Sequence, residues 1–227
     1  MRSAGDSGSV FTTAVPWAPP VAGGEPWLFT PGVRRGPCGG PAVPLSLPGL
    51  PEAVLFDRDG TLVHDIPYNG DPDRVRLMPG ARAAVDAVRA RGLPVGVVTN
   101  QSGVARGLLT RRAVEAVRER LEKLLGPLDV WAVCPHGPAD GCACRKPSPG
   151  LIQAACAALG VDPRRTAVLG DIGADLAAAR AAGARGVLIP TPMTRPREIA
   201  AAERTAPDLL TAARGLLRAS AGPGGDH

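Results

Sequence analysis

The chain has 227 residues, of which 44% are hydrophobic, enough for one domain of ordinary size with some chain left over. Its formal charge of +5 comes from 24 Arg and 2 Lys against 21 acidic residues, but the basic residues are spread over the whole length and aromatic residues make up only 3%, so we expect no nucleic-acid-binding surface. No apolar run reaches the roughly 18 residues that span a bilayer, and the amino terminus has no signal-peptide core, so we expect a cytoplasmic protein without a membrane partner.

Residues 1–48 contain 8 Gly and 9 Pro and show neither a helical nor an alternating apolar period. Such a segment buries too little apolar surface to offset the entropy lost on ordering, which predicts a disordered leader. A partner-binding tail that uses Trp17, Trp27 and Phe29 is the alternative. We place the folded domain at residues 49–220 and a disordered tail at 221–227.

From Pro51 onward, apolar runs alternate with amphipathic stretches, which predicts an α/β fold: a doubly wound, mostly parallel sheet with helices on both faces. The predicted strands are Val54–Phe56, Pro94–Val98, Val130–Val133, Ala167–Leu169 and Val187–Ile189. The predicted helices are Pro79–Arg91, a helix capped by Thr110 with Val114, Val117, Leu121 and Leu124 facing inward, then Leu151–Leu159, Ala174–Ala182, Pro196–Arg204 and Ala206–Leu217.

Two carboxylates, Asp57 and Asp59, directly follow the first of these strands. An unbroken apolar run indicates a strand buried on both faces, and such strands present functional groups at their carboxyl ends. One carboxylate can attack an electrophile while the other moves a proton. Because two like charges about 4 Å apart repel by roughly 4 kcal/mol at an effective dielectric near 20, we expect a divalent cation between them.

Polar residues also follow two other predicted strands, and parallel strands bring their carboxyl ends to one edge of the sheet. Asp171 would complete the oxygen ligands of a Mg²⁺ held with Asp57 and Asp59. Asp175, one helical turn later, is either a supporting acid or a surface charge. Hydroxyl, amide and backbone donors suited to phosphate oxygens follow the other strand, at Thr99, Asn100, Gln101 and Ser102.

Lys146 stands out because the chain uses Arg for almost all of its basic residues. It lies in Cys144-Arg145-Lys146-Pro147, where a compact ammonium can neutralise a phosphate as a point charge. The other lysine, Lys123, is expected to be a solvated charge on a helix.

Cys134-Pro135-His136 and Cys142-Ala143-Cys144 supply two pairs of ligands, each spaced i, i+2. Three thiolates and one imidazole fill the tetrahedral coordination of Zn²⁺ and leave no place for a substrate, so we predict a structural zinc site. A disulfide within Cys-x-Cys is the alternative, and it leaves His136 unexplained.

The elements D-x-D-G-T, T-N, R-K-P and G-D, in this order over residues 54–175, resemble the four signatures of the haloacid dehalogenase superfamily. The resemblance implies that Asp57 is a nucleophile that forms an aspartyl phosphate, and that Asp59 protonates the leaving oxygen and later activates water. Thr99 and Lys146 would hold the phosphoryl group.

The Cys/His insertion before R-K-P is similar to the zinc-loop group of this superfamily, whose members act on heptose 1,7-bisphosphate or histidinol phosphate. The resemblance implies a minimal cap, a small phosphorylated metabolite as substrate, removal of the 7-phosphate of the heptose, and contact of Arg145 with the sugar or its second phosphate. Separately, we expect a monomer. Two departures leave the substrate range open: Ile172 stands where Lys is usual, and the zinc loop is short. The alternatives are a histidinol-phosphate phosphatase and a non-catalytic phosphate-binding module.

Overall fold

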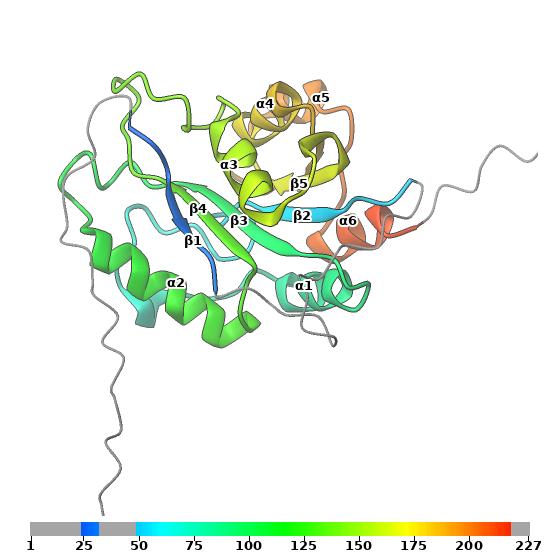
Figure 1. Ribbon diagram of the computed structural model, residues 1–227, viewed down its shortest axis with the longest axis horizontal. Coiled ribbons are helices and arrows are strands. Elements are labelled where there is room, and N and C mark those ends of the chain that lie inside the picture. Colours follow the sequence, from blue (N-terminus) through cyan, green and yellow to red (C-terminus); the bar gives the residue numbers. More distant parts are fainter. Residues whose placement is uncertain (1–23, 32–48, 219–227) are drawn as a thin grey trace, which may run out of the picture.

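The computed structural model describes residues 24–31 and 49–218, which contribute six strands to one sheet in the order β1-β4-β3-β2-β5-β6. The strands from β4 to β6 run parallel, and β1 is antiparallel to β4 (Figure 1). This arrangement confirms the predicted α/β fold. The strands are β1 (Trp27–Phe29), β2 (Ala53–Phe56), β3 (Val95–Asn100), β4 (Val130–Cys134), β5 (Thr166–Gly170) and β6 (Arg185–Leu188).

Helices cover both faces of the sheet (Figure 1). α3 and α4 pack on one face, α1, α2 and α6 lie on the other, and α5 packs against α4. The helices are α1 (Ala81–Arg89), α2 (Arg111–Leu125), α3 (Gly150–Leu159), α4 (Gly173–Ala182), α5 (Pro196–Ala201) and α6 (Leu209–Leu216), with short 3₁₀ turns at Pro72–Arg74 and Pro163–Arg165.

Strand β2 is apolar throughout because it is the middle of this two-faced core. Val54 and Phe56 pack into the apolar cluster on the side of α1, α2 and α6, whereas Leu55 packs into the cluster on the side of α3 and α4. Successive side chains of a strand point to opposite faces, so a strand covered on both faces needs apolar residues at every position. The strand therefore holds Asp57, which follows it, in a fixed place.

Local signals set several helix ends as expected. The Thr110 side chain accepts a hydrogen bond from the Ala113 amide at 3.1 Å and caps α2. Gly160 and Gly183 end α3 and α4 in the left-handed conformation, with φ of 68° and 78°. In α2 the fourth core residue is Leu125 rather than the predicted Leu124, which is only partly buried.

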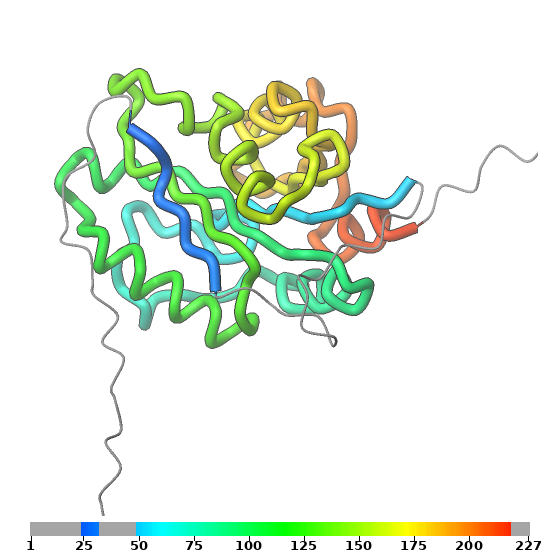
Figure 2. The backbone as a smooth tube through the Cα atoms, viewed as in Figure 1, coloured from blue at the N-terminus to red at the C-terminus, as the bar shows by residue number. Residues whose placement is uncertain are grey.

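The prediction of a disordered leader over residues 1–48 is wrong for residues 24–31, which contain β1. Figure 2 shows this segment, in blue, running alongside β4. Trp27 and Phe29 pack over the Arg111 guanidinium, whose carbon lies 5.1 Å and 5.3 Å from their ring centroids. The contacts of these rings with Arg111 and the pairing with the otherwise open edge of β4 stabilise the strand. The composition of residues 1–48 alone does not reveal these contacts, because both partners lie far along the chain. Residues 1–23 and 32–48, with Trp17, and the predicted tail at 221–227 lie outside the described residues.

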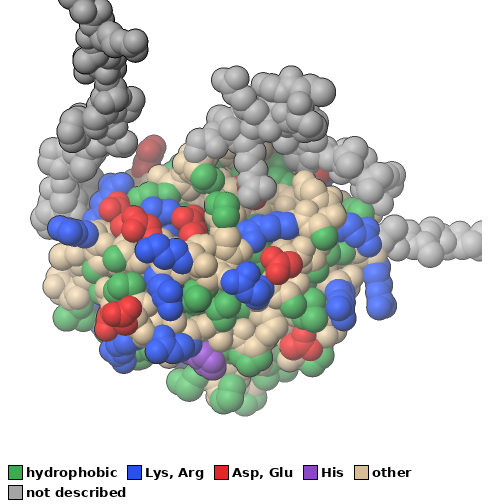
Figure 3. Space-filling view, turned by 90° about the horizontal axis from the view of Figure 1, so that it is seen from below, with side chains coloured by type: hydrophobic (Ala, Val, Ile, Leu, Met, Phe, Trp, Pro, Cys, Tyr) green, Lys and Arg blue, Asp and Glu red, His purple; other side chains and the backbone are tan. Residues whose placement is uncertain are grey.

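The segments that follow β2 and β3 contain no separate cap domain in the part of the chain that the structure describes. None of the described helices is long and apolar enough to cross a membrane. On the face drawn in Figure 3, Lys and Arg side chains are interspersed with acidic and apolar ones.

Candidate active site

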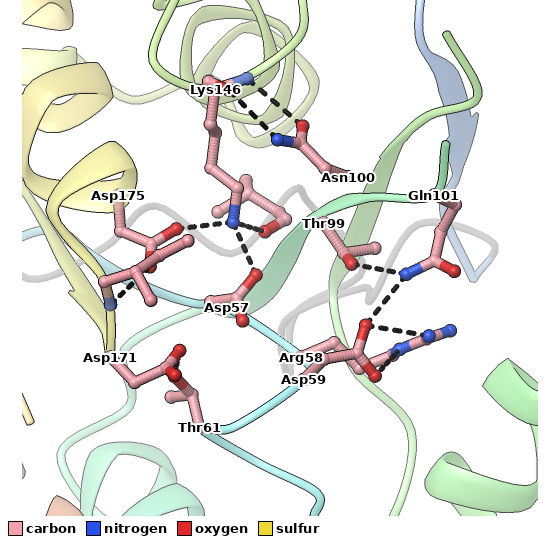
Figure 4. A network of polar contacts seen from close by, with 12 residues as sticks. Asp57, Arg58, Asp59, Thr61, Thr99, Asn100, Gln101, Lys146, Asp171 and Asp175 are labelled. Carbon is pink, nitrogen blue, oxygen red and sulfur yellow. Dashed lines mark hydrogen bonds and ion pairs between the residues drawn. The ribbon is translucent and has the colours of Figure 1, made fainter. Parts of the chain in front are cut away.

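The carboxyl ends of three neighbouring parallel strands meet at one edge of the sheet and carry the predicted site (Figure 4). Asp57 follows β2, Thr99 lies near the end of β3, and Asp171 follows β5. Lys146 comes from the loop after β4. All four side chains are buried, so their charges and hydrogen bonds act in a medium much less polar than water.

Lys146 lies at the centre of this group. Its Nζ is 2.5 Å from Asp57 Oδ1 and 2.6 Å from Asp175 Oδ1, and it donates a hydrogen bond to the Val98 carbonyl at 2.9 Å. Burial acts to lower the pKa of Lys146, but the attraction of Asp175 and Asp57 outweighs it and the pKa is raised. The ammonium is therefore charged at neutral pH.

The backbone of Lys146 is also held in place. Asn100 Nδ2 donates to the Lys146 carbonyl at 3.0 Å, and the Lys146 amide donates to Asn100 Oδ1 at 3.1 Å. Asn100 thus acts on the site through the main chain of the lysine loop. A side chain fixed in this way needs little reorganisation when it meets an anion.

Three carboxylates, those of Asp57, Asp171 and Asp175, have ligand oxygens within 4.8 Å of one another. Burial, opposed by Lys146, raises the pKa of Asp57 well above its ordinary value. Burial and the charge of Asp175 raise the pKa of Asp171 to about 7. Hard oxygen ligands that repel one another in this way fit Mg²⁺, whose charge favours their ionised forms.

Neighbouring groups fix the position of Asp171. Thr61 Oγ1 donates to Asp171 Oδ1 at 3.2 Å, and Thr194 Oγ1 donates to the Asp171 carbonyl at 2.6 Å. Gly60 lies so close that a Cβ atom there would sit 2.3 Å from Asp171 Oδ2, and its φ of +80° also favours glycine. The glycine of D-x-D-G-T thus makes room for the carboxylate that follows the neighbouring strand β5, which is distant in the sequence.

The Asp59 side chain is not part of this carboxylate group, in which Asp175 joins Asp57 and Asp171. The expected magnesium set of Asp57, Asp59 and Asp171 stays a prediction. Arg58 donates to both Asp59 oxygens, from Nε at 3.0 Å and from Nη2 at 2.8 Å. Gln101 Nε2 donates to Asp59 Oδ2 at 2.9 Å. The spacing i, i+2 puts both acids at one strand end, but it does not determine which way each side chain turns.

The other predicted phosphate ligands differ in how close they lie to the site. Thr99 and Gln101 are buried at the site and joined by a hydrogen bond of 2.9 Å. Ser102 is half-buried in the same loop, where its carbonyl accepts from the Arg106 amide at 3.2 Å. Arg145 is turned toward the cysteine loop and donates to the His136 carbonyl at 3.3 Å.

Cys134, His136, Cys142 and Cys144 form a buried cluster whose ligand atoms lie within 4.8 Å of one another. Neighbouring sulfurs are 3.7 Å and 3.6 Å apart, and His136 Nδ1 lies 3.5 Å and 3.2 Å from two of them. Zinc–sulfur bonds of about 2.3 Å in a tetrahedron require sulfurs about 3.8 Å apart, so the cluster has the dimensions of a zinc site.

The protonation of this cluster also suits a cation. A hydrogen bond from Cys144 is the largest cause of a pKa of about 6 at Cys134, and the same bond raises the pKa of Cys144. His136 is fully buried, and its Nε2 has no partner among the described residues. Three thiols and one imidazole, hydrogen-bonded mainly to one another, form a donor set that fits Zn²⁺.

Three residues at the site were not singled out by the sequence: Arg58, Thr61 and Thr194. Arg58 and Thr61 lie inside the D-R-D-G-T element itself, so their position next to the two acids was a usable signal. Thr194 lies in a loop far along the chain and carried none.

Several known proteins are similar to this chain in sequence and in structure. The HAD-hydrolase-like family model matches residues 143–213. The D-glycero-β-D-manno-heptose-1,7-bisphosphate 7-phosphatase of Pseudomonas aeruginosa is 38% identical over 143 residues, which cover 61% of this chain and 80% of the relative. The enzyme of the same name from Bordetella bronchiseptica is 36% identical with the same coverage.

Among solved structures, the D,D-heptose 1,7-bisphosphate phosphatase of B. bronchiseptica, complexed with magnesium and phosphate, superimposes with a TM-score of 0.65 at 32% identity. The superposition covers 73% of this chain and 98% of that one. The chain therefore belongs to the haloacid dehalogenase-like hydrolase family.

Proposed function

We propose that this protein is a magnesium-dependent phosphatase that removes the 7-phosphate of D-glycero-β-D-manno-heptose 1,7-bisphosphate. One observation carries the catalytic part of the proposal: a buried ammonium, Lys146, bridges Asp57 and Asp175 beside Asp171, at the strand edge that also holds Thr99. The substrate is inferred from the relatives, which are 31–39% identical and carry the heptose name.

In the proposed reaction, Asp57 attacks the phosphorus atom while the bond from phosphorus to the sugar oxygen breaks. Asp59 gives its proton to that leaving oxygen. Water then attacks the phosphorus of the aspartyl phosphate and loses a proton to Asp59, which releases inorganic phosphate and restores the Asp57 carboxylate. The covalent intermediate divides a very slow reaction into two easier steps.

Two of the chain's own residues would hold the phosphoryl group during both steps. The Lys146 ammonium is a point charge beside the nucleophile, and the Thr99 hydroxyl is a hydrogen-bond donor on the neighbouring strand. Both are buried and prearranged, so they favour the charge that develops on the phosphoryl oxygens without reorganising.

Asp57, Asp171 and Asp175 are the carboxylates positioned to hold Mg²⁺. When bound, the ion supplies charge neutralisation and Lewis-acid polarisation of the phosphoryl group. We assign the side chain of Asp59 to proton transfer alone, because it is turned toward Arg58 and Gln101.

We propose that Cys134, His136, Cys142 and Cys144 hold a structural Zn²⁺. The segment between the two ligand pairs contains Gly, Pro and Asp and offers little apolar surface of its own, so a metal would replace a hydrophobic core there. The same loop leads directly into Arg145 and Lys146, which gives the zinc a positioning role for the catalytic lysine.

A panel of phosphate esters tests the function. With Mg²⁺ present, we expect phosphate release from the 7-position of heptose 1,7-bisphosphate with a kcat/KM at least about 100-fold above that for histidinol phosphate. Histidinol phosphate is the second candidate because the zinc loop resembles both groups. Turnover of histidinol phosphate alone would move the protein to that group, and release from no ester would indicate a non-catalytic phosphate-binding protein.

The panel should include both anomers and a heptose 7-monophosphate. Ile172 lies beside Asp171 and is 39% exposed. An apolar side chain there offers no charge to a second phosphate, so a small preference for bisphosphate over monophosphate is expected. We also propose that the protein acts as a monomer on this small metabolite, which light scattering during size-exclusion chromatography checks.

A further inference from the structure

The Gln101 side chain joins the two halves of the site. Its Nε2 donates one hydrogen bond to Thr99 Oγ1 and one to Asp59 Oδ2, both at 2.9 Å (Figure 4). A primary amide nitrogen carries two hydrogens, so both are in use. The residue is buried, and its backbone amide donates a hydrogen bond to the Cys134 carbonyl at 2.7 Å, which holds Gln101 at the end of β4.

The first of these bonds orients the Thr99 hydroxyl. A hydroxyl has one hydrogen to donate and two lone pairs that accept. Because the oxygen accepts from Gln101, its own hydrogen must point elsewhere. The hydroxyl is thereby prepared to donate to an anion that arrives beside Lys146.

The second bond acts on Asp59. The Arg58 side chain, 3% exposed, already donates to both carboxylate oxygens, and Gln101 adds a third donor on Oδ2. The Arg58 guanidinium on one side and the Gln101 amide on the other restrict rotation of the Asp59 carboxylate. They hold it apart from the group of Asp57, Asp171 and Asp175.

We propose that Gln101 is a positioning residue that links the phosphate-binding hydroxyl of Thr99 to the proton-transfer carboxylate of Asp59. One amide sets the direction of both groups, so the proton donor is aligned with the leaving oxygen when the phosphate is held by Thr99. Arg58 holds the Asp59 carboxylate on the side opposite Gln101. The inference rests on the proposed phosphatase function and on proton transfer by Asp59.

The leaving group provides a test that a purely structural role would not meet. An alkyl ester such as the sugar phosphate needs a proton on the leaving oxygen as the phosphorus–oxygen bond breaks. A p-nitrophenyl ester leaves as a stable anion and needs almost none. General acid catalysis typically contributes about 10²–10⁴-fold, so misplacing the acid affects mainly the first substrate.

The experiment compares Gln101→Met and Gln101→Glu, which keep the length of the side chain but remove the amide donors. The control is Gln153→Met, at an exposed position on α3. We expect kcat for the sugar phosphate to fall at least about 100-fold in both Gln101 variants and kcat for p-nitrophenyl phosphate to fall less than about 10-fold. KM should rise for both esters, since Thr99 loses its orientation, and the control should match the wild type.

Equal losses of kcat on the two esters would overturn the inference, because they would indicate a role in phosphate binding or packing alone. Wild-type activity in Gln101→Glu would also overturn it, since shape without the amide would then suffice. Circular dichroism and thermal unfolding verify the fold, and either variant alone is enough for the comparison. A wild-type protein inactive on both esters would instead refute the proposed function, and the inference with it.

Discussion

Replacing Lys146 by methionine tests the electrostatic account of the site. The substitution keeps an unbranched side chain of similar length and removes the charge that lies 2.5 Å from Asp57 and 2.6 Å from Asp175. Breaking a buried ion pair by removing one partner typically costs about 3–5 kcal/mol, because the remaining charge is left uncompensated.

We expect the lower end of this range in the absence of Mg²⁺. Burial already raises the pKa of Asp57, and loss of the ammonium raises it further, so the carboxyl group takes up a proton and limits the loss. A decrease of about 3 kcal/mol in the free energy of unfolding corresponds to roughly 6–12 °C in Tm for a chain of this size. Mg²⁺ should restore part of it by binding the folded state. The kcat/KM should fall at least about 100-fold.

Urea denaturation followed by circular dichroism, with and without Mg²⁺, measures the effect. Lys123→Met is the matched control, because Lys123 is the other lysine of the chain and is exposed on α2. It should change stability by less than about 0.5 kcal/mol. A loss below about 1 kcal/mol for Lys146→Met, together with unchanged turnover, would show that the Lys146 ammonium neither stabilises the buried carboxylates nor acts in catalysis.

Three further predictions follow from single contacts. Because the pKa of Asp171 is raised to about 7 in the fold, the metal-free protein retains a proton that the unfolded chain has lost above its ordinary pKa of 3.8. The free energy of unfolding without Mg²⁺ should therefore fall as the pH rises from about 4 to 7, and Asp171→Asn should flatten this slope; identical slopes would contradict the assignment. Cys142→Ser should lower both the zinc content, measured by elemental analysis, and the Tm. Cys156→Ser, at a buried cysteine outside the cluster, should leave the zinc content unchanged. Full zinc content in Cys142→Ser would exclude the cluster as the zinc site. Thr110→Ala should cost about 1 kcal/mol by removing the cap of α2, and no change in urea denaturation would show that this hydrogen bond is not formed in solution.

The parts of the fold that depend on local patterns were accessible from the sequence. The apolar run before Asp57 predicted a buried strand because both faces of β2 are covered, and the glycines after α3 and α4 predicted their ends. Strand β1 was missed because its three residues gain their stability from Arg111 and from β4, more than eighty residues away in the chain.

At the site, the sequence predicted which residues meet but not how their side chains face one another. The carboxyl-end rule for parallel strands brought Asp57, Thr99 and Asp171 together, and the rarity of lysine pointed to Lys146. Asp175 rather than Asp59 joins Asp57 and Asp171 because Arg58 and Gln101 hold the Asp59 carboxylate, whereas Lys146 holds that of Asp175. Side-chain direction of this kind arises from contacts between separate loops and leaves no spacing pattern in the sequence.

The covalent route through Asp57 is tested by identifying the residue that carries the phosphoryl group during turnover. The protein is mixed with substrate and Mg²⁺, quenched in acid within one turnover, digested and analysed by mass spectrometry. We expect one phosphoryl group on Asp57 in the wild type and none in an inactive Asp57→Asn variant. A phosphoryl group on another residue, or turnover by Asp57→Asn, would contradict it.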